Sequence, residues 1–148
     1  MLQRLIAYFT RYRIPTGTYC HPKLGIFEFV KGVGWRRFLD IDGEGVEVIL
    51  GSNGELPNST MLECLEYWIS NWGNRRSEIN DYIELECRSW PPHDLGPEAD
   101  RLILSSVELL WPEKPWSCMI YLALPEDDER QFHISFDGVV PTAFAYDH

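Results

Sequence analysis

Apolar residues recur at every second position in several short segments, which is the pattern of half-buried β-strands. In the first part of the chain these segments are 35–42 and 46–50, and 24–33 is also predicted to be a strand because it carries aromatic and β-branched residues. Asp42-Gly43, between the two alternating segments, is typical of a hairpin turn because Gly adopts a positive φ without steric cost. The pattern predicts a three-strand antiparallel meander.

The same alternation returns near the other end of the chain. Val107, Leu109 and Trp111 share one face of a predicted strand, and both faces of 117–124 are apolar, which is typical of a central strand. In 131–136 apolar and polar residues alternate regularly. Residues 139–146 are expected to add an edge strand, since Pro141 cannot donate to a ladder. These segments predict a second meander.

Between the two meanders the apolar spacing changes to that of helices. One helix is expected to begin at Ser59 or Thr60 and to end at Gly73, with Thr60 and Glu63 as a capping box. A second is expected over 75–90, where two prolines end it. A short amphipathic helix is predicted over 2–12. The expected fold class is α+β: an antiparallel sheet of two meanders of about three strands, packed on a helix pair, in a single domain over 1–148.

The run Asp40-Ile-Asp-Gly-Glu-Gly45 offers an alternative to the hairpin, because its acidic residues fit the opening of a calcium-binding loop. Such a loop needs a bidentate Glu at its twelfth position, and that position is Gly51. It also needs helices on both sides, whereas the flanking segments alternate as strands do. The hairpin is therefore the preferred interpretation, and no metal site is predicted.

Charge narrows the classes of partner. The net charge is −10 over 148 residues, and it is unevenly distributed. Residues 1–37 hold seven Lys/Arg and one acidic residue, whereas the remainder holds six Lys/Arg and 22 Asp/Glu. An acidic body repels nucleic acid and suits a basic protein partner. The strongest acidic run, which we expect to form a hairpin tip and to bind that partner, is Glu126, Asp127, Asp128 and Glu129.

The lengths of the apolar runs and the spacing of the cysteines indicate where the protein is located and whether its thiols are reduced. The apolar runs are far shorter than the roughly 18 residues of a membrane span, and the apolar block at the N-terminus is too short for a secretory signal. No membrane association is predicted, and a cytoplasmic location is expected. The four cysteines form no C-x-x-C pair, so free and mostly buried thiols are expected.

Catalytic signatures of the common enzyme classes are absent from the sequence. The histidines are His21, next to Cys20, His93, next to Asp94, His133 and His148; none has a nucleophile or metal ligand placed beside it by a recognisable pattern. Two charged side chains fall on predicted apolar faces. Glu86 lies on the stripe of the second helix, and Arg37 lies on the strand face of Trp35 and Leu39. A contact between Glu86 and Arg37 is the basis of an alternative, enzymatic interpretation.

Two local features resemble a family of small bacterial domains of unknown function. They are Leu24-Gly-Ile-Phe-Glu-Phe29 followed by Trp35, and Phe132-His-Ile-Ser-Phe-Asp-Gly138. Some domains of this kind are similar to immunity proteins of bacterial toxin systems. The resemblance covers about residues 20–148, and it implies a protein-binding role with no catalytic residues to carry over.

The sequence thus favours a non-catalytic cytoplasmic protein-binding module, of the type that inhibits a basic enzyme. The alternative hypothesis is a small hydrolase or ligand-binding enzyme that uses Glu86, Arg37 or a histidine. No cofactor is predicted. The oligomeric state is left open.

Overall fold

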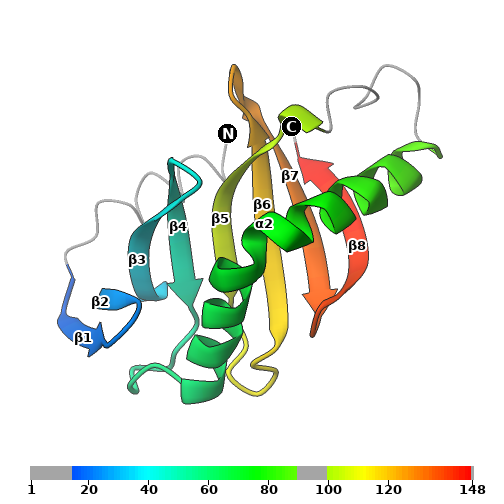
Figure 1. Cartoon of the computed structure of the whole chain (residues 1–148). Helices are drawn as coiled ribbons and strands as arrows, with labels where there is room; N and C mark the ends of the chain where they lie inside the picture. Colours follow the sequence, from blue (N-terminus) through cyan, green and yellow to red (C-terminus); the bar gives the residue numbers. More distant parts are fainter. Residues whose placement is uncertain (1–14, 90–99, 148) are drawn as a thin grey trace.

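The computed structural model describes residues 15–89 and 100–147; for 127–129 and 146–147 only the backbone is described. The predicted N-terminal helix, His93 and His148 lie outside the described residues. In the described chain, eight strands form one sheet in the order β1 to β8, and the helix α2 crosses one face of it (Figure 1). The strands are β1 (Gly17–His21), β2 (Gly25–Val30), β3 (Gly34–Ile41), β4 (Glu44–Leu50), β5 (Ile103–Leu109), β6 (Ser117–Leu124), β7 (Asp127–Asp137) and β8 (Val140–Asp147).

The expected arrangement of two meanders on a helix pair is wrong. All neighbouring strands pair antiparallel except β4 and β5, which are parallel and join two four-strand halves into one mixed sheet. Parallel neighbours cannot be joined by a tight turn, and the long connection between them contains α2. The sequence did not predict β1, because its five residues are too few to show clear alternation.

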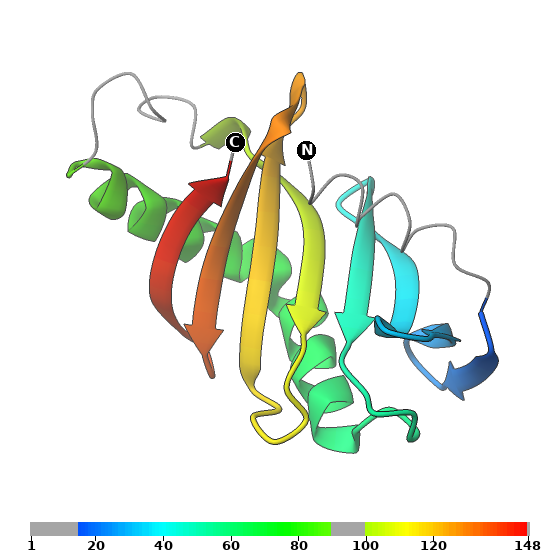
Figure 2. The same ribbon diagram turned by 180° about the vertical axis from the view of Figure 1, so that it is seen from behind.

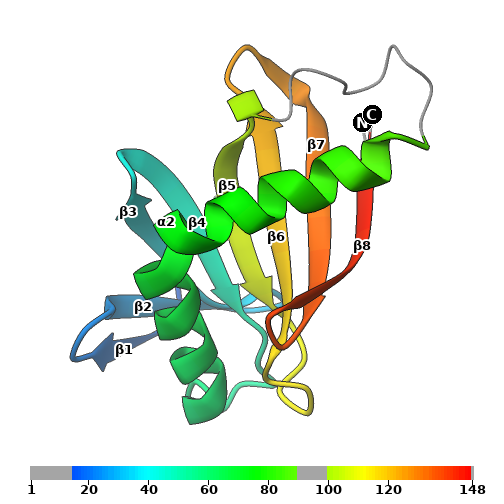
Figure 3. The ribbon, with the colours of Figure 1, turned by 45° about the vertical axis from the view of Figure 1, so that its right-hand side comes forward.

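The two predicted helices are one. α2 runs over Ser59–Cys87, and Gly73 lies near its middle rather than at its end. The buried stripes on either side of Gly73 are in phase, because Trp72 and Ile79 are seven residues, or about two turns, apart. A helix of 29 residues is about 43 Å long, which is enough to cross the sheet, and it bends along its length (Figure 3).

Capping defines the start of α2. Asn58, not Thr60, is the N-cap: its side-chain oxygen accepts hydrogen bonds from the backbone N–H groups of Thr60 (2.9 Å) and Met61 (3.2 Å). This satisfies two of the four N–H groups that a helix leaves without a partner. The predicted starting point at Ser59 is confirmed, whereas the predicted capping box is wrong.

The core lies between α2 and the sheet face toward it. Val46, Val48 and Leu50 of β4 pack there with alternate residues of β5, β6 and β7, and Trp68 of α2 is 1% exposed. Two arginines of α2 reach backbone carbonyls next to the strands: Arg75 donates to Val139 in the β7–β8 turn, and Arg76 donates to Leu102, just before β5. Trp111 follows β5 in a loop and is 40% exposed, so its predicted place beside Val107 and Leu109 is wrong.

The β3–β4 connection is the predicted hairpin and not a calcium-binding loop. β3 ends at Ile41 and β4 begins at Glu44, so the turn is Asp42-Gly43. Both residues have positive φ, 56° and 81°, as a two-residue type I′ turn requires. A carboxylate oxygen of Asp40 accepts the N–H of Gly43 at 3.0 Å. The acidic residues of the run therefore hold and flank a tight turn.

Candidate functional site

The side of α2 that faces away from the sheet carries a row of carboxylates. Glu63, Glu78, Asp81 and Glu84 are exposed, and Glu66 is partly exposed. Their spacings place all five within about 60° of one line along the helix. We call these five residues the α2 acidic stripe; α2 itself lies in front of the sheet in Figure 1.

The charges near the end of α2 oppose the helix dipole. The first turn has no acidic residue and the last turn has no basic one, while Glu84 and Glu86 occupy the last turn. A helix carries partial negative charge at its carboxyl end, so each misplaced charge there is unfavourable by about 0.3–1 kcal/mol at the surface. The first basic residue beyond these charges is the C-cap, Arg88, and no ion pair joins it to Glu84 within the described residues.

Ion pairs neutralise only part of the stripe. Glu66 lies 3.2 Å from Nε2 of His21 and 2.9 Å from Nζ of Lys23, and this contact raises the pKa of Lys23. Glu78 pairs with Arg75 at 2.6 Å. Within residues 15–89 and 100–147, no ion pair engages the remaining three members, Glu63, Asp81 and Glu84. These three charges are available to a partner.

The acidic tip is smaller than the sequence predicts. The β6–β7 connection consists of Pro125 and Glu126, because β7 already begins at Asp127. Glu126 is exposed and forms an ion pair with Arg101, which reduces the net charge of the tip. The other three residues, Asp127, Asp128 and Glu129, are the first residues of strand β7 and not part of a loop. That the run 126–129 binds a partner stays a prediction.

Glu86 and Arg37 are held by different parts of the fold. Nη1 of Arg37 donates to the carbonyl of Ile26 at 3.0 Å, and its guanidinium lies against Gly25. Glu86, in the last turn of α2, is partly exposed. Burial raises the pKa of Tyr82, and the charge of Glu86 adds to that shift. Among the described residues no ion pair or hydrogen bond joins Glu86 to Arg37.

The two described histidines, His21 and His133, lie in different parts of the fold. Nδ1 of His21 accepts the backbone N–H groups of Lys23 (3.3 Å) and Leu24 (3.1 Å), so Nε2 carries the proton toward Glu66. His21 thus ties the β1–β2 hairpin to α2, and its ring has no free basic nitrogen. His133 lies on the opposite face of the sheet from α2, beside Tyr121, with ring centroids 5.7 Å apart. Neither of these two histidines forms a hydrogen bond or ion pair with Glu86 in the described chain.

The sheet face turned away from α2, seen in Figure 2, carries a polar cluster. Glu47 of β4 and Tyr121 of β6 both lie beside Ser106 of β5. Glu108 is on the same face, two residues farther along β5. Nη1 of Arg36, a side chain that is 8% exposed, lies 4.0 Å from Glu47. Strand order, not sequence proximity, brings these groups together.

Glu108 is the most perturbed carboxyl group of this cluster. Its pKa is raised from 4.5 to about 7, first by burial and then by the charge of Glu47, while a hydrogen bond with Tyr121 opposes the shift. A carboxyl group that keeps its proton close to neutral pH can donate a hydrogen bond or a proton to a bound molecule. The neighbouring Glu47, close to Arg36, is the second carboxyl of the pair.

The Glu108→Gln variant is expected to gain stability relative to the wild type when the pH is raised from 5 to 8. The folded pKa lies above the unfolded value, so the folded state keeps a proton that the unfolded state releases, and wild-type stability falls between about pH 4.5 and 7. Gln does not ionise. The advantage of the variant should therefore grow by about 1–3 kcal/mol across that interval, as measured by urea unfolding at both pH values. Glu44→Gln, at the exposed β3–β4 turn, is the control; a difference that is independent of pH would contradict the prediction.

Sequence reasoning did not single out the stripe or Glu108. The signal for the stripe was present, because Glu63, Glu66 and Asp81 recur at helical spacing in segments predicted to be helical. The signal for Glu108 was not, because the alternation of 103–109 shows only that Glu108 faces away from Val107 and Leu109. Its neighbour Glu47 is 61 residues away in the sequence, and only the parallel β4–β5 pairing places the two together.

The comparisons with known proteins give no relative. No family model matches the chain, and no match was found among the curated proteins or the solved structures. The resemblance to small bacterial domains is thus untested.

Proposed function

We propose that the protein is a non-catalytic binding module whose α2 acidic stripe docks onto a basic protein surface. The observation that supports this most directly is the set of three exposed carboxylates, Glu63, Asp81 and Glu84, that have no ion-pair partner in the described chain. Glu84 also opposes the dipole of its own helix. A local feature that lowers stability without compensation is typical of a functional surface.

A partner with Lys or Arg side chains facing this stripe would pair with the free carboxylates and would offset the unfavourable interaction of Glu84 with the helix dipole. Charge complementarity of this kind raises the association rate and selects the partner, and it weakens with salt, because the Debye length is about 8 Å at 0.15 M. Leu85, which is 58% exposed on the same side of α2, would add an apolar contact at the end of the stripe. Inhibition of a basic enzyme is the form of this activity that we favour.

We also propose a cytoplasmic location. All four cysteines are free thiols in the structure, and two of them, Cys64 and Cys118, are buried. Reduced cysteines are typical of cytosolic proteins. Within the described residues, no helix combines the length and apolar character that a membrane span requires.

The test is capture from native lysate with three baits: the wild type, a stripe variant and a charge-matched control. The stripe variant is Glu63→Lys/Asp81→Lys/Glu84→Lys. The control carries Glu44→Lys/Glu55→Lys/Glu113→Lys, three exposed acids on other elements. We expect a protein of basic isoelectric point to be retained by the wild type and the control, and its affinity to fall at least tenfold, about 1.4 kcal/mol, with the stripe variant.

Two outcomes would refute the proposal. One is that the wild type retains no basic protein in 0.15 M salt. The other is that the stripe and control variants lose the retained protein equally, which would indicate attraction by net charge alone.

A further inference from the structure

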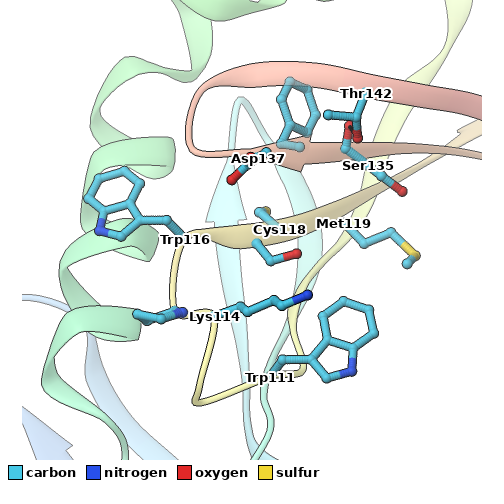
Figure 4. A pocket seen from close by; sticks show the side chains of 11 residues that line it. Trp111, Lys114, Trp116, Cys118, Met119, Ser135, Asp137 and Thr142 are labelled. Atoms are coloured by element: carbon cyan, nitrogen blue, oxygen red, sulfur yellow. Dashed lines mark hydrogen bonds between the residues drawn. The ribbon is translucent and has the colours of Figure 1, made fainter.

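A pocket of about 610 Å³ lies at the end of the sheet where β6 begins (Figure 4). Three elements form its walls. The β5–β6 loop contributes Trp111 and Lys114, the start of β6 contributes Cys118 and Met119, and the β7–β8 hairpin contributes Asp137. This volume is in the range of small-molecule sites, about 300–1,000 Å³.

Two opposite charges line the pocket from opposite walls. Lys114 comes from the β5–β6 loop and Asp137 from the β7–β8 hairpin, and Figure 4 shows them on the two sides of β6. In the part of the chain that the structure describes, neither side chain forms an ion pair with the other or with a third residue. The pocket therefore presents one cation and one anion that are more than 4.0 Å apart.

The remaining wall is apolar with a few hydroxyl groups. The indole of Trp111 is 40% exposed, which is unusual for so large an apolar side chain, and it lies on the same side as the amino end of Lys114 and the thioether of Met119 (Figure 4). Ser117 and Ser135 also line the pocket, and the hydroxyl of Thr142 is engaged in donating to the carbonyl of Ser135 at 3.1 Å. An aromatic surface beside separated charges is the chemistry of an amphipathic, charged ligand.

We propose that this pocket binds a small zwitterion with an aromatic or large apolar side chain, the chemistry of a free amino acid or a dipeptide. The ligand carboxylate would meet Lys114, its ammonium group would meet Asp137, and its side chain would lie against Trp111. A simple anion would satisfy Lys114 but would face Asp137 and a protein of net charge −10. A zwitterion has no net charge, so that field does not oppose it.

The test is calorimetric titration of the full chain with L-tryptophan and with the dipeptide tryptophyl-glycine, whose charges are farther apart. We expect saturable binding of one of the two, and the stronger binder identifies the free amino acid or the peptide as the source. Trp111→Ala, Lys114→Met and Asp137→Asn should each weaken that binding at least tenfold. Asp42→Asn and Lys31→Met, which change the same charges at the β3–β4 and β2–β3 turns, should leave it unchanged.

Modified ligands show which charge meets which side chain. Tryptophanamide lacks the carboxylate and N-acetyltryptophan lacks the ammonium group, so both should bind the wild type at least tenfold more weakly than tryptophan; if the dipeptide is the stronger binder, its C-terminal amide and N-acetyl forms replace them. Lys114→Met should no longer distinguish the amide from the parent ligand, and Asp137→Asn should no longer distinguish the acetyl form. The absence of saturable binding at millimolar concentration of both ligands would overturn the proposal, and so would binding that the three pocket substitutions leave intact.

Discussion

Gly34→Ala is expected to lower the free energy of unfolding by about 3 kcal/mol or more. Gly34 begins β3 with a φ of +118°, a conformation that costs a residue with a Cβ about 1–3 kcal/mol. A Cβ built there would also overlap the carbonyl oxygen of Leu50 and lie 3.1 Å from its carbonyl carbon. These are backbone atoms of the neighbouring strand β4, so no side-chain rotation relieves the overlap, and overpacking adds about 1–3 kcal/mol.

Gly43→Ala separates the two contributions. Gly43 also has a positive φ, +81°, but a Cβ there would meet nothing within 4 Å. The free energy of unfolding should therefore fall only by the conformational cost, about 1–2 kcal/mol, in Gly43→Ala. Denaturant unfolding of both variants measures the difference. Equal losses would mean that β3 and β4 can move apart to accommodate the added methyl group.

The position of Gly34 also shows what the sequence could and could not predict. Alternation, together with the aromatic and β-branched residues of 24–33 and the apolar run of 117–124, located seven of the eight strands. It could not reveal which strands are neighbours. Leu50 lies against Gly34 through the β3–β4 hairpin, which is local, whereas β4 meets β5 across more than fifty residues that include α2.

The helix shows a different limit. Gly73 was interpreted as a helix end because Gly is common just past helix termini. In the structure it is an interior residue, and a Cβ there would meet nothing within 4 Å. The cost of one interior Gly is only about 1 kcal/mol, and the burial of Trp72 and Ile79 on either side outweighs it. Tertiary packing therefore outweighed the local preference of Gly73. The apolar residues before and after Gly73 are in phase on one continuous helix, and that pattern was visible in the sequence.

For the candidate sites, the sequence predicted chemistry better than position. The acidic character of the chain was evident, but the consecutive run 126–129 drew attention because its acidic residues are adjacent. β7 begins within that run, and Arg101 pairs with its first residue. Acidic residues three or four apart on a helix share one side, whereas successive residues on a strand point to opposite faces. The stripe of α2 is for this reason the more coherent surface.

The other large expected effect is at the contact between α2 and the sheet. Trp68→Ala should lower the free energy of unfolding by about 3–5 kcal/mol, as large-to-small substitutions in cores do. Trp68 is 1% exposed, and its ring meets that of Phe136 of β7 edge-on, with centroids 4.6 Å apart. The guanidinium of Arg75, which also holds the carbonyl of Val139, lies 5.4 Å from the indole. Removing the indole therefore leaves a cavity and loosens the β7–β8 turn from α2.

Trp111→Ala, the same change at a 40% exposed position, is the matched control and should cost less than about 1 kcal/mol. If Trp68→Ala does not fold, Trp68→Phe, which keeps an aromatic ring against Phe136, should fold and lose less. Denaturant unfolding measures the stabilities, and hydrogen exchange should show faster exchange of the β7–β8 amides than of the β1–β2 amides in the Trp68 variants. Losses of similar size at Trp68 and Trp111, or exchange that rises equally in both hairpins, would mean that Trp68 does not anchor α2 to this end of the sheet.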